Sequence, residues 1–283
     1  MGYLISHPRL KLEIKLEEIK KLHTHEEIIP RIAKWLSIEI KRGIIKDPVI
    51  VDKETLVVLD GMHRVAALQH LGYKLIPICL VNYNNPSIRV ESWFRTIENG
   101  QKTGENVRKD LEKSGYNLQE VVDNDLKRKM YDREIIIGIV TSRKCYCIPG
   151  KIEGIKEIYE YIKQLERNLG SVGYNICYET ESDAVNKVKT GKALAVIIAP
   201  RTTKKDVVTA ALSGEVFVHK STCHVIPARP LFVNVPTEWL NMDSRKANTL
   251  LLEHLSKKKL RRLPAGQTLD RRYKEELYVF SDT

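Results

Sequence analysis

Residues 57–72, VVLDGMHRVAALQHLG, decide how the first third of the chain is expected to fold. The apolar run VVLD ends at an Asp-Gly pair, and the apolar residues that follow recur at helical spacing as far as Gly72, a typical helix stop. Two β-rich runs, DPVIVD at 47–52 and TLVVLD at 55–60, lead into this stretch and are separated only by Lys53 and Glu54, which is a hairpin signal. We therefore predict a hairpin that leads through a tight turn into a helix.

The sequence on either side extends this pattern. Residues 16–43, LEEIKKLHTHEEIIPRIAKWLSIEIKRG, carry apolar residues at helical spacing before and after Pro30. We predict helical structure on both sides, with a short turn from His23 to Glu26, a helix from about Pro30 and a stop at Gly43. The run LIPICLVNY at 75–83 is predicted to be a further strand.

The second half of the chain has a different pattern. Residues 100–130 are polar, which is typical of a surface helix and a connector. Strand-like and helix-like segments then alternate: REIIIGIVTS pairs with KCYCIP, and GIKEIYEYIKQLERNLG, YNICYE, ESDAVNKVKTG, ALAVIIAP and TKKDVVTAALSGE follow. Such alternation predicts an α/β or α+β fold class with a second, smaller domain.

Composition limits the class of protein. The chain has 283 residues, of which 42% are hydrophobic, so it can bury a sizeable core. We find no apolar run of membrane-spanning length and no secretory signal at the N-terminus, and we expect a cytoplasmic protein without a membrane partner. The five cysteines lack CxxC spacing, which argues against a disulfide framework and a zinc site.

The net charge of +11 raises the possibility of nucleic-acid binding. Residues 244–283 alone hold ten Lys and Arg against five acidic residues, and their KKKLRR run could contact phosphates. A solvated basic face is the simpler explanation of the same run, and a nucleic-acid partner of this tail stays open as the alternative.

Three polar clusters could carry chemistry. In the turn Asp60, Gly61, Met62, His63, Arg64, the helix start offers unpaired N–H groups to an anion such as a phosphate. Asp60 could cap the helix, orient His63 or hold a divalent metal that bridges phosphates. An ordinary capped helix with two surface basic residues would look the same in sequence.

The other two clusters are HTHEE at 23–27 and GEVFVHKSTCHVIP at 214–227. A partly buried carboxylate in the first could accept a proton from a hydroxyl, and the donors of the second suit a carboxylate or phosphoryl group. A solvated helix entrance and a polar loop are the simpler explanations. The chain has no P-loop, GxGxxG, HExxH or GxSxG motif, which argues against the familiar nucleotide and hydrolase folds.

Together, the hairpin, the DGxHR turn and the Ala-rich helix resemble the ParB/sulfiredoxin-like superfamily. The HEE at 25–27, the SWF at 92–94, the IPG at 148–150 and the run from IIAPRTTKKDVV through SGEVFVHKSTCHVIP make the chain similar to its free serine kinase family, over roughly residues 15–240 and in order. The resemblance implies a ParB/sulfiredoxin-like nucleotide-binding domain at 1–100, a connector at 101–130, an α/β substrate-loop domain at 131–243 packed against the first domain, and a basic extension at 244–283.

The resemblance also implies a function: a kinase that uses ADP or ATP and Mg²⁺ to convert free L-serine to O-phospho-L-serine for cysteine biosynthesis. By position, Glu26 matches the catalytic carboxylate, with Asp60 and His63 beside it in the catalytic set. The phosphate-binding turn is Asp60, Gly61, Met62, His63 and Arg64, and the substrate-binding residues are Trp93, Lys220, Ser221, Thr222 and His224.

Two positions depart from the family pattern. Met62 stands where the family turn, DGHHR, has its first histidine, and Cys223 stands where the substrate loop commonly has an arginine. Either change could alter the nucleotide or the substrate. L-Threonine is the nearest alternative acceptor, because one methylene-sized group changes binding by only about 1 to 3 kcal/mol.

A ParB-like DNA-binding or nucleotide-switch protein is the alternative class. It predicts a helix-turn-helix after the first domain, where the sequence instead has strands.

Overall fold

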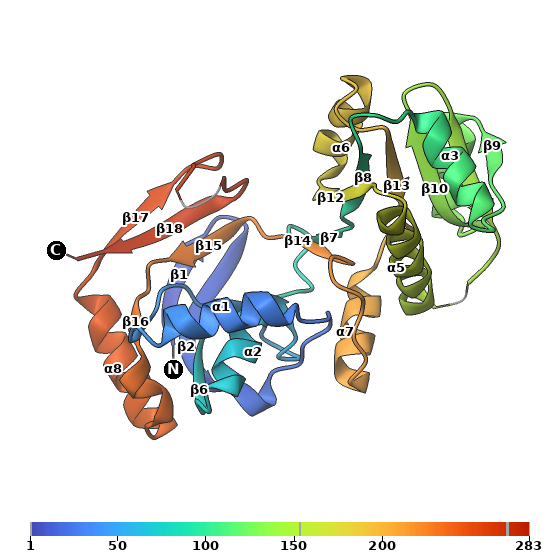
Figure 1. Cartoon of the computed structure of the whole chain (residues 1–283). Helices are drawn as coiled ribbons and strands as arrows, with labels where there is room; N and C mark the ends of the chain where they lie inside the picture. The colour runs from blue at the N-terminus through green and yellow to red at the C-terminus, as the bar shows by residue number, and fades with distance from the viewer. Residues whose placement is uncertain (1, 153, 270–271, 283) are drawn as a thin grey trace. The chain divides into compact units, whose positions relative to one another are not determined.

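A computed structural model describes residues 2–152, 154–269 and 272–282 (Figure 1). The chain forms two compact units, which we call unit 1 and unit 2. Unit 1 comprises Met1–Arg89, Val207–Val216 and His224–Thr283, and unit 2 comprises Val90–Asp206 and Phe217–Cys223. These boundaries differ from those drawn from the sequence, because the chain returns to unit 1 after residue 206 and again after residue 223.

Unit 1 is built on a mixed sheet with the strand order β1-β2-β6-β4-β5. The strands are β1 (Tyr3–His7), β2 (Leu10–Glu18), β4 (Val49–Asp52), β5 (Val58–Asp60) and β6 (Leu75–Val81). β4 and β5 form the predicted antiparallel hairpin, and β4 pairs parallel with β6. The predictions of the hairpin and of the strand at 75–83 are thus confirmed.

The helical spacing before Pro30 was misleading. Residues up to Glu18 belong to β2, in which Leu10, Leu12, Ile14 and Leu16 are buried at alternate positions, and only the single-turn helix η1 (Ile19–Lys21) follows. Pairing of β2 with both β1 and β6 explains the difference, because Leu16 faces the sheet's core with a strand period of two.

Two helices complete the N-terminal part of unit 1. α1 (Pro30–Ile40) begins at Pro30 as predicted, and α2 (Met62–His70) begins directly after the Asp-Gly turn. They pack against each other. Two short strands, β3 (Ile44–Ile45) and β16 (Val235–Pro236), pair antiparallel, and η2 (Thr237–Asn241) leads to the C-terminal part.

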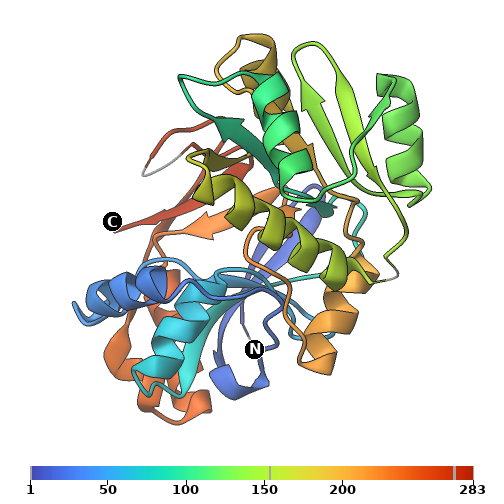
Figure 2. The same ribbon diagram turned by 45° about the vertical axis from the view of Figure 1, so that its right-hand side comes forward.

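The C-terminal residues are an integral part of unit 1 and not a separate extension. α8 (Ser244–Ser256) packs on β2, where the side chain of Asn248 bonds both backbone groups of Leu16. β18 (Glu276–Ser281) pairs with β17 (Lys259–Leu263) and, in parallel, with β15 (Ala228–Leu231). Figures 1 and 2 show the red β17 and β18 beside the orange β15. The exposed basic residues of β17 lie on an edge strand, where charge discourages pairing with another chain.

Unit 2 is built on an antiparallel sheet with the strand order β12-β8-β13-β10-β11-β9. The strands are β8 (Phe94–Glu98), β9 (Gln119–Val121), β10 (Ile135–Thr141), β11 (Cys145–Pro149), β12 (Asn175–Glu179) and β13 (Ala195–Ile198). Its helices are α3 (Gly104–Lys113), α4 (Asp123–Tyr131), α5 (Ile155–Ser171) and α6 (Glu181–Lys189). Residues 101–130 are therefore no connector, because α3 packs on α5 and β9 extends the sheet beside β11.

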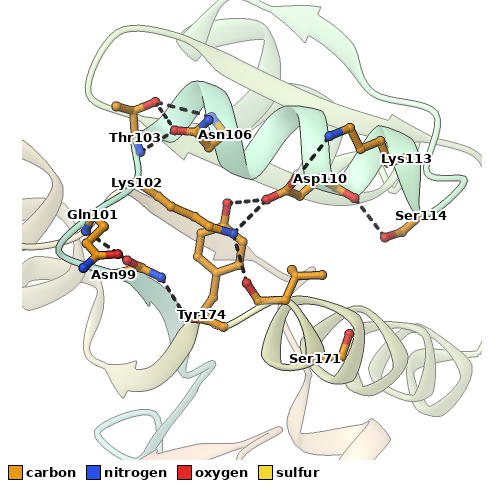
Figure 3. A network of polar contacts seen from close by, with 12 residues as sticks. Asn99, Gln101, Lys102, Thr103, Asn106, Asp110, Lys113, Ser114, Ser171 and Tyr174 are labelled. Atoms are coloured by element: carbon orange, nitrogen blue, oxygen red, sulfur yellow. Dashed lines mark hydrogen bonds and ion pairs between the residues drawn. The ribbon is translucent and has the colours of Figure 1, made fainter.

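A polar network in unit 2 joins α3 to the chain between α5 and β12 (Figure 3). The carboxylate of Asp110 accepts hydrogen bonds from the Tyr174 hydroxyl at 2.9 Å and from Lys102 Nζ at 3.1 Å. Lys102 Nζ also lies 4.1 Å from the centre of the Tyr174 ring and donates to the Val172 carbonyl. At the start of the helix, Thr103 and Asn106 form a capping box.

The remaining elements lie where the chain passes from one unit to the other. These are β7 (Arg89–Glu91), α7 (Lys204–Ser213) and β14 (Cys223–Val225). Among the helices in the described part of the chain, none is long and apolar enough to cross a membrane.

Candidate functional site

The turn between β5 and α2 depends on a glycine. Gly61 is the N-cap of α2 and has a φ of +99°, in the left-handed region that a glycine adopts without strain. A Cβ at this position would also lie 2.7 Å from Val49 Cγ1 and 3.0 Å from Arg64 Nη2. The turn therefore brings its backbone close to its neighbours in a way that no other residue allows.

Gly61, the N-cap of α2, has no side chain with which to cap the helix. The Asp60 carboxylate contacts two arginines: Oδ2 lies 3.3 Å from Arg64 Nη2 and 3.0 Å from Arg229 Nη1. Two guanidinium groups thus meet one carboxylate close to the start of α2, where helix amide groups favour a negative charge.

Both arginines are held firmly by further contacts. Arg64 Nη1 donates to the carbonyls of Asp47 at 2.6 Å and Pro48 at 3.0 Å. Arg229, on β15, forms a second ion pair through Nε with the carboxylate of Glu275. Burial disfavours the charged form of Arg229, but the two carboxylates hold its pKa above the ordinary value.

A cavity of about 580 Å³ opens beside these charges, within unit 1. Asp60, Arg64 and Arg229 lie in its wall together with Tyr273. The apolar part of the wall comes from α1, β3, β4, β15 and the loop before β4, and consists of Trp35, Leu36, Ile40, Ile44, Ile45, Pro48, Ile50, Pro230 and Leu231. Further charged residues of the wall are Glu39, Arg42, Lys46 and Asp47. A cavity of this size that combines apolar surface with charged groups is suited to a small-molecule or cofactor ligand.

The HTHEE segment runs beside the same turn. His23 bridges to Val57 next to β5, and both His25 and Glu26 are buried. The backbone N–H of Ile29, the residue before α1, donates to His63 Nε2 at 3.0 Å. His63 therefore links the turn to the segment that carries Glu26, with its Nε2 as the acceptor of this hydrogen bond.

His224, from the C-terminal part of unit 1, lies beside His25. Its Nε2 lies 2.8 Å from the Tyr83 hydroxyl, and its ring centre lies 5.4 Å from that of His25. Burial lowers the pKa of His25 to about 4 and raises that of Tyr83 well above its ordinary value. His25 and Tyr83 are therefore neutral near pH 7, and both contact the His224 ring.

The other predicted substrate residues meet in unit 2. The Trp93 indole donates to the Thr222 carbonyl at 2.9 Å, and Lys220 Nζ lies 4.1 Å from the centre of the Trp93 ring. The Ser221 hydroxyl is buried and donates to the Val218 carbonyl at 2.6 Å. Lys220 has a φ of +64° and so adopts a left-handed backbone conformation that is unusual for a lysine.

Arg95 organises this loop. Its side chain is fully buried and donates to Glu166 Oε1 at 2.6 Å, to the Trp93 carbonyl at 2.8 Å and to the Lys220 carbonyl at 3.1 Å. The rings of Tyr159 and Tyr178 lie 5.3 and 5.5 Å from its Cζ atom. One guanidinium group therefore fixes Trp93 and Lys220 relative to each other.

The structure thus brings the predicted residues together in two groups. Unit 1 holds Glu26, the Asp60–Arg64 turn and His224, whereas unit 2 holds Trp93, Lys220, Ser221 and Thr222. Sequence reasoning missed Arg95 and Arg229. The available signal was an arginine inside an otherwise apolar strand, FRTIE and ARPL, because such a charge must find partners when buried.

The described residues offer no ready metal cage. Among residues 2–152, 154–269 and 272–282, no group of three or more His, Cys, Asp and Glu side chains could hold a metal ion. Asp60 is the cavity-wall carboxylate that contacts both Arg64 and Arg229, and its side chain is 38% exposed.

Comparison with known proteins places these observations in context. No protein-family model matches the chain. The ATP-dependent L-serine kinase of Staphylothermus marinus is 27% identical over 240 residues, which cover 82% of this chain and 93% of that protein. The ADP-dependent L-serine kinase of Thermococcus kodakarensis is 26% identical over 238 residues, which cover 82% and 95%.

Solved structures agree with the sequence comparison. Free serine kinase in complex with AMP superposes with a TM-score of 0.64 and 26% identity, over 80% of this chain and 93% of that one. The chain is therefore related, in sequence and in fold, to the free L-serine kinases.

Proposed function

We propose that this protein is a kinase that transfers a phosphoryl group from ADP or ATP to the hydroxyl of free L-serine and gives O-phospho-L-serine. One observation carries the proposal: the cavity of unit 1 is walled by Asp60, Arg64 and Arg229, and His63 ties the same turn to the segment with the buried Glu26. Phosphoryl transfer depends mainly on positioning and charge neutralisation, and these are the parts that it needs. Supply of cysteine biosynthesis is the role that the family resemblance implies for the product.

The nucleotide is assigned to the cavity. Arg64, Arg229 and the amide groups at the start of α2 are suited to the phosphates, and the apolar lining that includes Trp35 is suited to the base. Met62, the first residue of α2, contributes its backbone N–H at this point. The relative solved with AMP supports an adenine nucleotide as the ligand.

Magnesium is assigned to Asp60 together with the nucleotide phosphates. Mg²⁺ commonly binds through one or two carboxylates, substrate phosphates and water, so a complete protein cage is not required. The Asp60 carboxylate fits this role because it is partly exposed in the cavity wall. Bound there, the ion would neutralise charge on the transferring phosphate.

Glu26 is assigned as the general base, following the family resemblance. Its burial suits a carboxylate that takes a proton from a hydroxyl, and the Ile29–His63 hydrogen bond anchors the end of its segment. His63 then acts by positioning, since its Nε2 is used by that bond. His224 and Tyr83 offer hydrogen-bonding groups to the amino-acid substrate in the same unit.

The loop of unit 2 is assigned to the amino acid and its new phosphate. Lys220 and Thr222 supply a charge and a hydroxyl, and Trp93 supplies an aromatic wall. Ser221 is assigned to the shape of the loop, because its hydroxyl hydrogen is used by the Val218 carbonyl.

A phosphoryl-transfer screen tests the function. Purified protein with Mg²⁺ is incubated with ADP or ATP and with L-serine, L-threonine or L-homoserine, and the products are measured by mass spectrometry. We expect O-phosphoserine with at least one donor and none from the Glu26→Gln variant. Phosphothreonine as the main product would retain the mechanism but replace the substrate, and no phosphorylated amino acid with any pair would refute the kinase function.

A ParB-like DNA-binding function is less consistent with the fold. Among the described residues, the part of the chain from Val90 to Asp206 forms the antiparallel sheet of unit 2 and its helices, where that class would need a helix-turn-helix.

A further inference from the structure

The C-terminal residues, which lie outside the family resemblance, reach the proposed nucleotide cavity. β18 pairs parallel with β15, and the backbone N–H of Glu276 donates to the Pro227 carbonyl at 3.0 Å. This pairing places the residues that precede β18 beside the start of β15, the strand that carries Arg229. All of these residues belong to unit 1.

Two side chains of this segment take part in the cavity wall or act on it. Tyr273 is buried and lines the cavity, with its ring centre 6.0 Å from Arg229 Cζ. Glu275 forms the ion pair with Arg229 Nε, while Nη1 of the same guanidinium contacts Asp60. Because these two nitrogen atoms lie in one rigid plane, two carboxylates on different elements fix the orientation of Arg229.

We propose that the segment Tyr273–Glu275 is a functional part of the nucleotide site, with Glu275 as the positioning residue for Arg229 and Tyr273 as part of the cavity wall. The inference rests on the proposed function, since it assigns Arg229 to the nucleotide phosphates. Without Glu275, the guanidinium loses one of its two fixed partners and can turn toward Asp60, away from the orientation that the phosphates require.

Glu276, the first residue of β18, provides a matched control directly after Glu275. It directly follows Glu275, but its carboxylate contacts His7 Nε2 at 3.3 Å and Arg262 Nε at 2.6 Å, and it is not among the cavity-lining residues. These contacts hold the pKa of Glu276 down at about 2, so its removal also breaks ion pairs. Glu276→Gln therefore reports the cost of losing an acidic residue here without loss of the Arg229 contact.

The experiment compares binding of MgADP to the full-length protein and to the Glu275→Gln and Glu276→Gln variants by isothermal titration calorimetry, together with KM values for nucleotide and L-serine. We expect Glu275→Gln to weaken MgADP binding about tenfold and to raise the nucleotide KM by a similar factor, with the L-serine KM changed less than twofold. Glu276→Gln should keep the wild-type affinity even if its melting temperature falls.

Tyr273→Leu gives an independent test if Glu275→Gln does not fold, since it keeps the ion pair but removes the ring from the wall. We expect about threefold weaker MgADP binding. If Glu275→Gln folds and binds MgADP as tightly as the wild type or more tightly, the inference is overturned but the proposed function is not. If Glu275→Gln does not fold, unchanged or tighter MgADP binding by Tyr273→Leu has the same meaning. A wild-type protein that bound no adenine nucleotide would overturn the proposed function and this inference with it.

Discussion

Replacement of Arg95 by lysine should uncouple the loop of unit 2 while it keeps the positive charge. The guanidinium group of Arg95 donates along three directions, to Glu166 Oε1, the Trp93 carbonyl and the Lys220 carbonyl. A lysine ammonium is a single point on a flexible stem and cannot reproduce this planar fork. We expect it to keep the ion pair with Glu166 and to leave the two carbonyls without their donor.

The size of the effect follows from these contacts. A hydrogen bond that involves a charged group contributes about 1.5 to 3 kcal/mol, and two are lost in a fully buried position. The variant should therefore unfold with a free energy lower by about 3 kcal/mol or more. For a chain of this length such a loss corresponds to a fall in melting temperature of about 6 °C or more.

The assay combines thermal unfolding with kinase kinetics. We expect Arg95→Lys to raise the KM for L-serine about tenfold or more while the affinity for MgADP, bound in unit 1, stays within twofold. Arg108→Lys is the matched control, because Arg108 forms solvent-screened ion pairs on α3 with Glu105 and Glu112, which contribute little to stability. A wild-type melting temperature and serine KM in Arg95→Lys would refute the assignment of Arg95 as the organiser of the loop.

Three further predictions concern unit 1. Glu26→Gln should lower kcat at least about 100-fold while MgADP affinity by calorimetry stays within twofold, and wild-type kcat would exclude Glu26 as the base. Gly61→Ala should destabilise the protein by about 2 to 4 kcal/mol in urea unfolding, because the added Cβ meets Val49. Gly72→Ala is the control: Gly72 has a φ of +75° but open space around it, so this variant should lose only about 1 kcal/mol. Equal losses in the two variants would contradict the steric argument. Burial lowers the pKa of His25 to about 4, whereas the unfolded chain binds the same proton near pH 6.5. The free energy of unfolding should therefore fall by about 3 kcal/mol as the pH falls from 6.5 to 4, and this group should have little effect above pH 6.5. A His25→Gln variant with the same pH profile would contradict this origin.

The parts of the fold that follow local signals could be predicted from the sequence. The β4–β5 hairpin, the start of α1 at Pro30 and the Asp-Gly entry into α2 each depend on neighbouring residues and were found. The end of β2 was not, because the residues from Leu16 onward fit both a helical and a strand period. Only pairing with β1 and β6, which comes from elsewhere in the chain, decides between them.

The candidate site likewise has one part that the sequence predicts and one part that it does not. The turn around Gly61 is visible in sequence because strand, glycine and helix signals adjoin one another. Arg229 lies 169 residues from Asp60 and meets it only in the folded chain. Its partner Glu275 belongs to a segment that composition marks only as basic and polar, and no local pattern distinguishes it from Glu276 beside it.

The backbone of Lys220 connects stability with function in the loop of unit 2. A non-glycine residue in the left-handed region costs on the order of 1 kcal/mol, so φ +64° at Lys220 must be imposed by its surroundings. Arg95 holds the Lys220 carbonyl in this conformation, and the Lys220 side chain lies over Trp93. Substitutions at Arg95 should therefore change both the loop geometry and the free energy of unfolding. Substitutions at the exposed ends of the loop should change the loop geometry but not the free energy of unfolding.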